Sequence, residues 1–485
     1  MKNIPYNNNR KILAGGAMVL AVIASVHAQP QAFMQAGTAQ PPPPSLPIPK
    51  VAAATNTVST LNSSGTNAAA ASLTSPLDKF FNGKIPDALA KGKVNADVRA
   101  RYEQANEEGV HAITKNSYAP TIHTRVGFTT APLYGFQAMV EGVNIAAIGP
   151  EANYNAAGSN HQGDRPVVAD PNLTRVDQAW VGYSYENWIK AKVGQQPINL
   201  DNQRFIGDVG WRQNMQTFDA VSVGSEPFKN FDLYYSYIWD VHRVFGDVNG
   251  LPAANTDFDS DSHLVNLSYS GWKYGRFVGY TYLLGLKNAA GAANSSATYG
   301  GYFAGSAPVN DRIKFDYRAE FAWQTDYGDS TLKYGTEYYN LEGGLSVKPF
   351  AFGAGYEDLG SGANTGAGGG RASFRTPLAT LHAFNGWDDV FLTTPADGLQ
   401  DFYAYAQVTL PEQIPVRFVF HKYDADYGGG NYGQEYDVVA SKKFGKYWTV
   451  MANYAYYQGE DSAAPSLAAA NVNIQKVWVS VEFKF

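Results

Sequence analysis

The sequence predicts an all-β fold, a transmembrane antiparallel β-barrel of about 16–18 strands, with about 18 favoured. Three observations lead to this prediction. The N-terminus has the layout of a cleavable export signal, and most of the chain alternates apolar and polar residues with a period of two. The last alternating segment ends at the C-terminal Phe485. We expect such a barrel in the outer membrane of a bacterial cell.

The composition excludes several classes of protein. The formal net charge of -6 argues against nucleic-acid partners, because binding phosphate requires a basic face. The mean hydropathy of -0.29 argues against a bundle of membrane helices. Aromatic residues make up 14% of the chain, which suits strands with one apolar and one wet face. The chain has no cysteine, so disulfides, thiol catalysis and thiolate metal sites are excluded.

Residues 1–28 are expected to be a signal peptide. Arg10 and Lys11 precede an apolar run, residues 12–24, that is too short for a comfortable bilayer anchor. Small residues then occupy the two positions that signal peptidase reads, which predicts cleavage after Ala28. A retained N-terminal anchor is the alternative. Residues 29–79 are rich in Pro, Ala and Ser and are expected to be a disordered periplasmic segment.

Residues 80–485 are expected to form the barrel. Residues 93–103, 312–324 and 477–485 alternate apolar and polar side chains without the spacing of a helix. In lipid every backbone polar group must be paired within the protein, and a closed sheet achieves this with strands. A soluble sheet is the alternative. It would not need an export signal together with a terminal strand that ends in Phe, a feature resembling the signal read by the outer-membrane assembly machinery.

Aromatic side chains near strand ends are expected to form girdles at the two membrane interfaces. They are Tyr183, Tyr185, Tyr235, Tyr237, Trp239, Tyr280, Tyr282, Tyr454 and Tyr456. Long loops are expected to face the outside at residues 147–171, 246–262, 288–310, 359–380 and 459–470, whereas short turns near residues 186 and 445 face the periplasm.

Basic residues on the polar alternates are expected to face the lumen. They are Arg99, Arg101, Arg125, Lys190, Lys192, Arg312, Lys314, Arg318 and Arg417. Guanidinium groups lower the barrier for anions and offer a planar fork for carboxylates. Carboxylates such as Asp97, Glu103 and Glu320 lie between them, so these charges could equally pair across strands and stiffen the wall. The sequence leaves both interpretations open.

Three segments carry a resemblance to a known family: residues 92–103, 193–221 and 383–401. Together they resemble the alginate-export family of porin-like outer-membrane β-barrel proteins, over roughly residues 80–485. The resemblance implies a large monomeric barrel with an arginine-lined pore that passes an acidic polysaccharide. It places Arg204 and Arg212 in or beside the pore, with Asp201, Gln203 and Asp219 as polar partners.

The sequence therefore predicts a channel rather than an enzyme, passing hydrophilic, anionic solutes or saccharides through a charged lumen. No Ser/His/Asp arrangement, cofactor motif or metal-ligand spacing supports catalysis, and Asp257, Asp259 and Asp261 are interpreted as solvated loop residues. The expected partners are outer-membrane lipid, the solute, and the assembly machinery through Phe485. Two alternatives remain: a dedicated exporter of an acidic polysaccharide such as alginate, and a structural or adhesive surface barrel with a plugged lumen. A third class, an outer-membrane hydrolase such as a phospholipase, would need a lipid-facing Ser/His pair near the girdle, and the sequence offers none.

Overall fold

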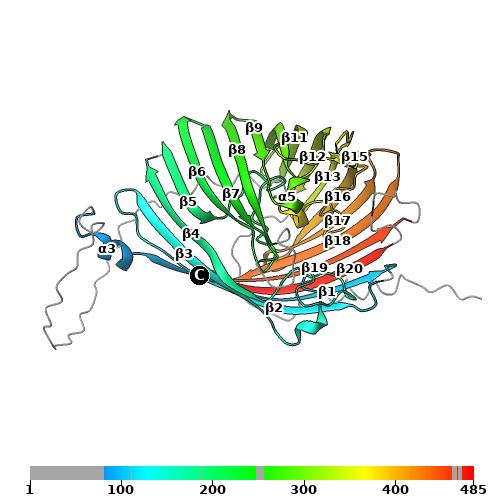
Figure 1. The fold of residues 1–485 in the computed structure, drawn as a ribbon, viewed down its shortest axis with the longest axis horizontal. Coiled ribbons are helices and arrows are strands. Elements are labelled where there is room, and N and C mark those ends of the chain that lie inside the picture. Colours follow the sequence, from blue (N-terminus) through cyan, green and yellow to red (C-terminus); the bar gives the residue numbers. More distant parts are fainter. Residues whose placement is uncertain are drawn as a thin grey trace, which may run out of the picture.

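The computed structural model describes residues 81–485, apart from residues 111, 187, 247–255, 367, 461–466 and 468–471. The predicted signal peptide and the Pro-rich segment lie outside the described residues. The first described element is a short helix, α3 (Ile85–Ala90), beside the start of the first strand (Figure 1). In the described part of the chain, no helix is long and apolar enough to cross a membrane.

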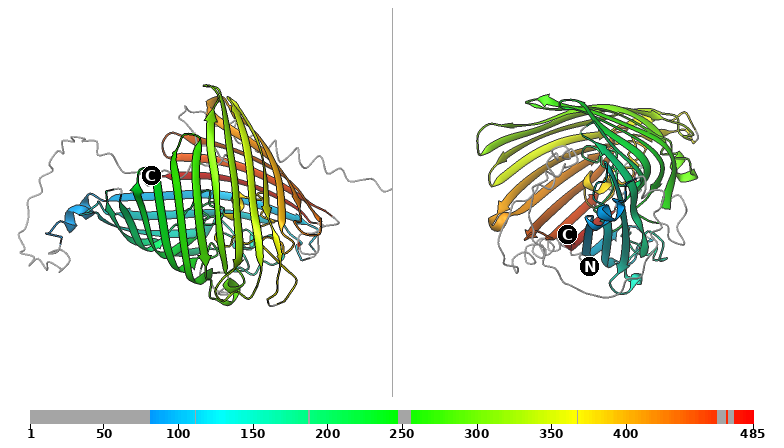
Figure 2. Two further views of the ribbon diagram at one scale, coloured as in Figure 1. Left: turned by 90° about the horizontal axis from the view of Figure 1, so that it is seen from above. Right: turned by 90° about the vertical axis from the view of Figure 1, so that its left-hand side faces the viewer.

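Eighteen antiparallel strands of the described chain form one sheet that closes on itself (Figure 2). Closure is made by β20 against β1, from the Asp97–Lys484 pair to the Glu108–Asn473 pair. This confirms the predicted fold class and the favoured strand number. The strands are β1 (Lys93–Glu108), β2 (Ser117–Thr129), β3 (Phe136–Ala147), β4 (Leu173–Tyr185), β5 (Ile189–Gln196), β6 (Thr217–Phe228), β7 (Phe231–His242), β8 (Asp257–Trp272), β9 (Gly275–Leu284), β10 (Ser296–Pro308), β11 (Ile313–Asp326), β12 (Gly335–Val347), β13 (Phe350–Leu359), β16 (Leu399–Leu410), β17 (Ile414–Asp424), β18 (Asn431–Phe444), β19 (Trp448–Gly459) and β20 (Asn473–Lys484).

The period-two pattern separates an apolar outer face from a polar inner face. On β11, Phe315, Phe321 and Trp323 are 40–45% exposed on the outside, whereas Arg318 and Glu320 are buried inside. Exposed apolar side chains recur on the outer alternates around the barrel. Because such a belt would be unfavourable in water, it identifies the surface that meets lipid.

Short turns join the strands at one end and long loops join them at the other. The turn between β18 and β19 at Gly445 is short, as predicted. By the general rule for these barrels the short turns face the periplasm. Additional elements lie between the barrel strands: the pair β14 (Ser361–Ala363) and β15 (Arg371–Ser373), α5 (Ala289–Ala292), and the turns η1 (Glu151–Asn153), η2 (Leu381–Ala383) and η3 (Pro411–Gln413).

Three predicted loops were wrong in extent. The loop predicted at 359–380 continues to residue 398, where β16 follows. The loop predicted at 246–262 includes the start of β8, whose Asp257, Asp259 and Asp261 lie on the same alternates as the lipid-facing Val265. The sequence pattern was interpreted as a loop because these outward-facing positions are acidic. They lie beyond the apolar belt, where the outer face of the strand meets water. The loop predicted at 288–310 is mostly β10. The glycines of this segment are typical of a loop, so the sequence did not indicate a strand. In the strand Gly300 leaves room for a neighbouring side chain, since a Cβ there would lie 2.5 Å from the Tyr280 hydroxyl.

The aromatic girdle prediction holds for part of its list. Tyr185, Tyr235 and Trp239 are 38–55% exposed on the outside. Tyr280 and Tyr282 were placed wrongly, because they are buried inside the barrel. The register of β9 explains this. Phe277 faces lipid, and Tyr280 and Tyr282 lie an odd number of residues after it, so they are on the opposite, inner face of the strand.

Candidate functional site

Two long loops fold into the barrel and contact each other there. Loop 197–216 connects β5 to β6, and loop 360–398 connects β13 to β16. Ile206 and Leu378, both fully buried, form a parallel bridge between them. The Thr380 N–H also donates to the Gln203 carbonyl over 3.0 Å. The two loops therefore form one inward unit rather than two independent flaps.

An aromatic cluster attaches this unit to the wall. The Phe205 ring lies 5.3 Å from the rings of Tyr280 and Tyr338 and 5.9 Å from that of Phe374. Tyr280 and Tyr338 come from the wall, whereas Phe374 belongs to loop 360–398. Such ring pairs add about 0.5–1.5 kcal/mol each beyond their buried area. They explain why these tyrosines point inward.

Arg204 forms a buried ion pair with the wall. Its side chain is 2% exposed, and its Nε donates to Glu357 Oε1 over 2.6 Å. Asn385 of loop 360–398 accepts from the same guanidinium group over 3.1 Å. Burial acts to lower the pKa of Arg204, but the charge of Glu357 outweighs this and raises it. The charge of Arg204 is thus used to hold both loops against β13.

Arg212 forms a second buried ion pair on another part of the wall. It lies 3.1 Å from Glu103 of β1 and 3.3 Å from Asp389 of loop 360–398. Asp389 also accepts from Lys476 of β20 over 3.0 Å and contacts His382 over 2.7 Å. Burial opposes the charge of Arg212, yet Glu103 raises its pKa overall. Both arginines that the family resemblance singled out therefore lie inside the barrel, paired and buried.

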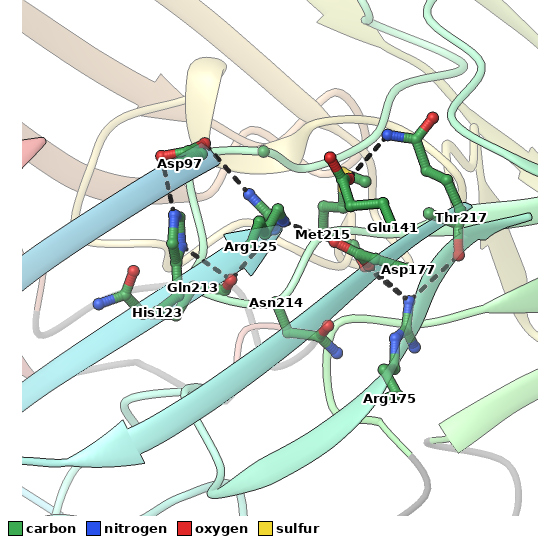
Figure 3. A network of polar contacts seen from close by, with 12 residues as sticks. Asp97, His123, Arg125, Glu141, Arg175, Asp177, Gln213, Asn214, Met215 and Thr217 are labelled. Atoms are coloured by element: carbon green, nitrogen blue, oxygen red, sulfur yellow. Dashed lines mark hydrogen bonds and ion pairs between the residues drawn. The ribbon is translucent and has the colours of Figure 1, made fainter. Parts of the chain in front are cut away.

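Wall arginines bind the backbone of loop 197–216. Arg99 donates to the Gly210 carbonyl over 3.1 Å, and Arg101 donates to the Trp211 carbonyl. Arg125 donates to the Gln213 carbonyl over 3.2 Å, and Arg175 donates to the Met215 carbonyl over 3.2 Å (Figure 3). A loop inside a barrel has no neighbouring strand to bond its carbonyls, and guanidinium groups supply several donors each. We call this set of four the arginine clamp.

The arginine clamp is itself held by carboxylates on the same wall. Arg125 lies between Asp97 and Asp177 (Figure 3). Its guanidinium nitrogens are 3.6 Å from Asp97 Oδ2 and 2.5 Å from Asp177 Oδ2. His123 Nε2 lies 3.1 Å from Asp97, while its Nδ1 faces the Gln213 carbonyl over 3.1 Å. The sequence left two interpretations of the basic residues open: they attract anionic solutes, or they pair with carboxylates across strands. The structure adds a third use, which is anchoring a loop.

The other residues implied by the resemblance have different positions. Asp201 accepts from Asn266 and from the Tyr302 hydroxyl, each over 2.8 Å, and so contacts the wall. Gln203 accepts from Thr380 over 2.6 Å, between the loops. Asp219 does not belong with them, because Phe218 and Ala220 occupy the inner face of β6 and leave it on the outer face, 3.3 Å from His242.

The remaining predicted basic residues differ in whether their charge has a partner in the barrel. Arg318 pairs with Glu320 at 2.6 Å, and Lys314 pairs with Asp316 at 3.0 Å. The Arg417 guanidinium lies 3.7 Å from the centre of the Tyr405 ring. Arg312 was placed wrongly on a strand: it is exposed in the turn before β11, which begins at Ile313.

Lys190 and Lys192 are the predicted lysines best placed to meet a solute. They occupy the inner alternates of β5, because Ile189 and Val193 are exposed on the lipid side. Both are half-buried, and neither forms an ion pair with a described residue. Lys192 Nζ lies 4.3 Å from the centre of the Trp180 ring. Sequence reasoning missed Arg276, which has the same kind of position on β9, next to the lipid-facing Phe277.

Two groups of described residues bring three possible metal ligands within 4.8 Å of one another. Asp97, His123 and Glu482 form the first, but Arg125 and Lys484 already pair with its carboxylates. The second contains Asp240, Asp257 and Asp259 and lies at the outer rim of β7 and β8. The expectation of no metal and no cofactor stays a prediction.

Comparison with known proteins gives structural but not sequence matches. No family model and no curated protein matches the sequence. The crystal structure of OccAB2 from Acinetobacter baumannii matches with a TM-score of 0.60 and 14% identity, covering 82% of this chain and 99% of that chain. The structure of OpdK from Pseudomonas aeruginosa with vanillate matches with a TM-score of 0.60, 12% identity and the same coverage. OpdL from Pseudomonas aeruginosa matches with 0.59 and 13%, again with the same coverage.

At these identities the similarity establishes the fold. The chain has the closed 18-strand architecture of bacterial outer-membrane porins. With its apolar outer belt, this architecture places the protein in the outer membrane.

Proposed function

We propose that the protein is a passive outer-membrane channel for small hydrophilic, anionic solutes and has no enzymatic activity. The observation that carries this proposal is the inward unit of loops 197–216 and 360–398. An 18-strand barrel without such loops would leave a wide aqueous lumen. Loops held to the wall by buried ion pairs support a fixed constriction, at which solutes can be selected.

The charge of the inner wall supports selection for anions. Lys190 and Lys192 are half-buried on the inner face and have no carboxylate partner among the described residues. Trp180 lies beside Lys192, so an aromatic ring and a positive charge are close enough to contact the same solute molecule. Vanillate, the molecule named with the OpdK structure, is an aromatic carboxylate and combines the two complementary groups. Small aromatic carboxylates are therefore the first solutes to test.

The test is the reversal potential of the purified protein in a planar bilayer under a salt gradient. We expect anion selectivity in the wild type and a shift toward zero in Lys190→Gln/Lys192→Gln, because two lumen charges are removed. Lys446→Gln is the matched control, since Lys446 is exposed in the turn between β18 and β19. A cation-selective channel, or a reversal potential that the double variant leaves unchanged, would contradict the proposal.

Export of an acidic polysaccharide is the second candidate. The resemblance to the alginate-export family favours it, since two of the segments that carry it overlap loops 197–216 and 360–398. The buried anchoring of these loops favours small solutes instead, because a polymer needs a wide and continuous path. Liposome swelling distinguishes the candidates: entry of uronate oligomers together with small carboxylates supports the exporter, and entry of small carboxylates alone supports the channel. No flux of either solute supports the structural barrel.

A further inference from the structure

A buried acidic cluster lies where loop 360–398 meets the barrel wall. Asp388 of the loop is 2% exposed, and Glu435 and Asp437 of β18 are 0% and 1% exposed. The Asp388 N–H donates to Glu435 Oε1 over 2.7 Å, which joins the loop to the strand. Asp401 of β16 is also 1% exposed. It lies on the other side of His421 of β17 from Asp437 and interacts electrostatically with that carboxyl group. Several carboxylates thus meet in one dry region.

Two members of the cluster, Asp388 and Asp437, have fewer hydrogen-bond donors than Glu435, which accepts from the Asp388 N–H and from the Tyr423 hydroxyl. Within the described part of the chain, no donor meets the geometry of a hydrogen bond to the carboxylate oxygens of Asp388 or Asp437. The nearest groups are the Tyr457 backbone beside Asp388 and the Glu435 carboxyl group beside Asp437, and the latter can donate only when it is protonated. Lys476 is close, but its Nζ donates to the Asp388 carbonyl over 2.6 Å and to Asp389 over 3.0 Å. His421 Nδ1 lies 2.9 Å from Asp401 Oδ1, and its Nε2 lies 3.7 Å from Asp437 Oδ2.

The charged and titratable groups that face the cluster come from every element around it. They are Asp389 of loop 360–398, Asp401 of β16, His421 and Tyr423 of β17, Glu435 and Asp437 of β18, Tyr457 of β19, and Lys476 of β20. His382 and Arg212 face Asp389. The carboxylates outnumber the bases, so the region needs additional positive charge.

Protons fit this requirement better than a metal ion. A buried carboxylate without donors neutralises by binding a proton, and the resulting acid supplies an O–H donor to its neighbour. Burial and the nearby charge of Glu435 raise the pKa of Asp388 well above its usual range. A metal would need several ligand atoms around one point. Among the described residues, the groups of three ligands within 4.8 Å of one another do not include these carboxylates.

We propose that Asp388, Glu435 and Asp437 form a proton-binding latch that holds loop 360–398 inside the barrel and releases it when the cluster loses its protons. This latch would regulate the proposed channel. Its effect on current rests on the proposed function, whereas its effect on loop mobility does not.

The direction of the pH dependence follows from the groups in the loop. The pKa of Asp388 is raised, so its contribution to docking is present at low pH and is lost as the pH rises through that pKa. The pKa of Asp389 is lowered by Lys476 and His382 despite its burial, so its ion pairs are lost only in strong acid. The latch should therefore loosen as the pH rises above the ordinary range of an aspartate pKa.

The absence of cysteine allows a clean test in the full-length protein. Leu392 lies in loop 360–398, is 43% exposed, and is close in sequence to Asp388. A spin label on Leu392→Cys in proteoliposomes reports loop mobility from about pH 5 to pH 9. We expect the ratio of mobile to immobile label to rise at least tenfold, since each proton released changes the equilibrium by up to about tenfold per pH unit.

Two variants identify the groups responsible. Asp388→Asn and Asp437→Asn keep the shape but cannot ionise, so the label should stay immobile throughout. Asp329→Asn, in the exposed loop between β11 and β12, is the control and should behave like the wild type. If Asp437→Asn does not assemble, Asp388→Asn alone decides the question. A mobility that is constant with pH in the wild type, or a transition retained in Asp388→Asn, overturns the latch.

Two further readouts separate the alternatives. Titration of Ca²⁺ against EDTA at fixed pH should leave the label unchanged, and a Ca²⁺-dependent transition would overturn the assignment to protons. Current is recorded under the same conditions. A label that moves with pH in a protein without conductance would sustain the latch and refute the channel, whereas an immobile label in a conducting protein would do the reverse.

Discussion

Replacing Arg204 by Met should release the inward loops from β13. The change removes the guanidinium group that lies 2.6 Å from Glu357 and leaves a buried carboxylate with Tyr338 and Asn385 as its donors, at 2.7 Å and 2.6 Å. Breaking a buried ion pair by removing one partner costs about 3–5 kcal/mol. At about 1.4 kcal/mol for each tenfold change, docking of the loops weakens by roughly a hundredfold to a few thousandfold.

Single-channel recording measures this loss. We expect Arg204→Met to show larger or fluctuating conductance, because undocked loops no longer hold a fixed constriction. Adding Glu357→Met should restore much of the wild-type behaviour, since it removes the unpaired charge as well. Arg312→Met, in an exposed turn, is the control for the substitution. Unchanged conductance and noise in Arg204→Met would refute the assignment of Arg204 as a loop anchor.

Three other perturbations test separate parts of the structure. Gly300→Val should destabilise the barrel by about 1–3 kcal/mol, since the added Cβ would lie 2.5 Å from the Tyr280 hydroxyl; urea unfolding in detergent measures it, and Gly279→Val on β9, where an added Cβ meets nothing within 4 Å, is the control. Asp389→Asn should weaken loop docking at neutral pH, where the lowered pKa keeps the wild-type carboxylate charged; equal label mobility in variant and wild type would contradict this. Phe485→Ala should reduce the amount assembled in the membrane while leaving the unfolding midpoint unchanged, because its side chain is 63% exposed; a lowered midpoint would instead indicate a packing role.

The barrel could be predicted from the sequence because lipid imposes one rule on every strand. An outer alternate that meets lipid must be apolar, so segments such as β11 and β20 show a period of two without information from the rest of the chain. The prediction failed where that rule does not apply. The acidic start of β8 lies above the lipid, and β10 uses glycines to accommodate cross-strand aromatic rings.

The site could be located from the sequence but its arrangement could not. Two of the three resembling segments, 193–221 and 383–401, indicated the loops that prove to fold inward, and Arg204 and Arg212 were both identified. Their partners were not, since Glu357 is 153 residues from Arg204 and Glu103 is 109 residues from Arg212. No local pattern specifies pairs so far apart. Nor does any pattern show that Arg99 and Arg125 bind loop carbonyls instead of solute.

The arginine clamp has a consequence for the order of assembly. Loop 197–216 bonds to β1, β2 and β4, which precede it, but also to β13, which is synthesised much later. Arg212 further shares Asp389 with Lys476 of β20, the strand that closes the barrel onto β1. Contacts between such distant segments form late, after the entropy of closing the intervening chain has been lost. A complete constriction therefore requires a completed barrel, and an incompletely closed intermediate in the membrane would be a wider and less selective hole than the finished protein.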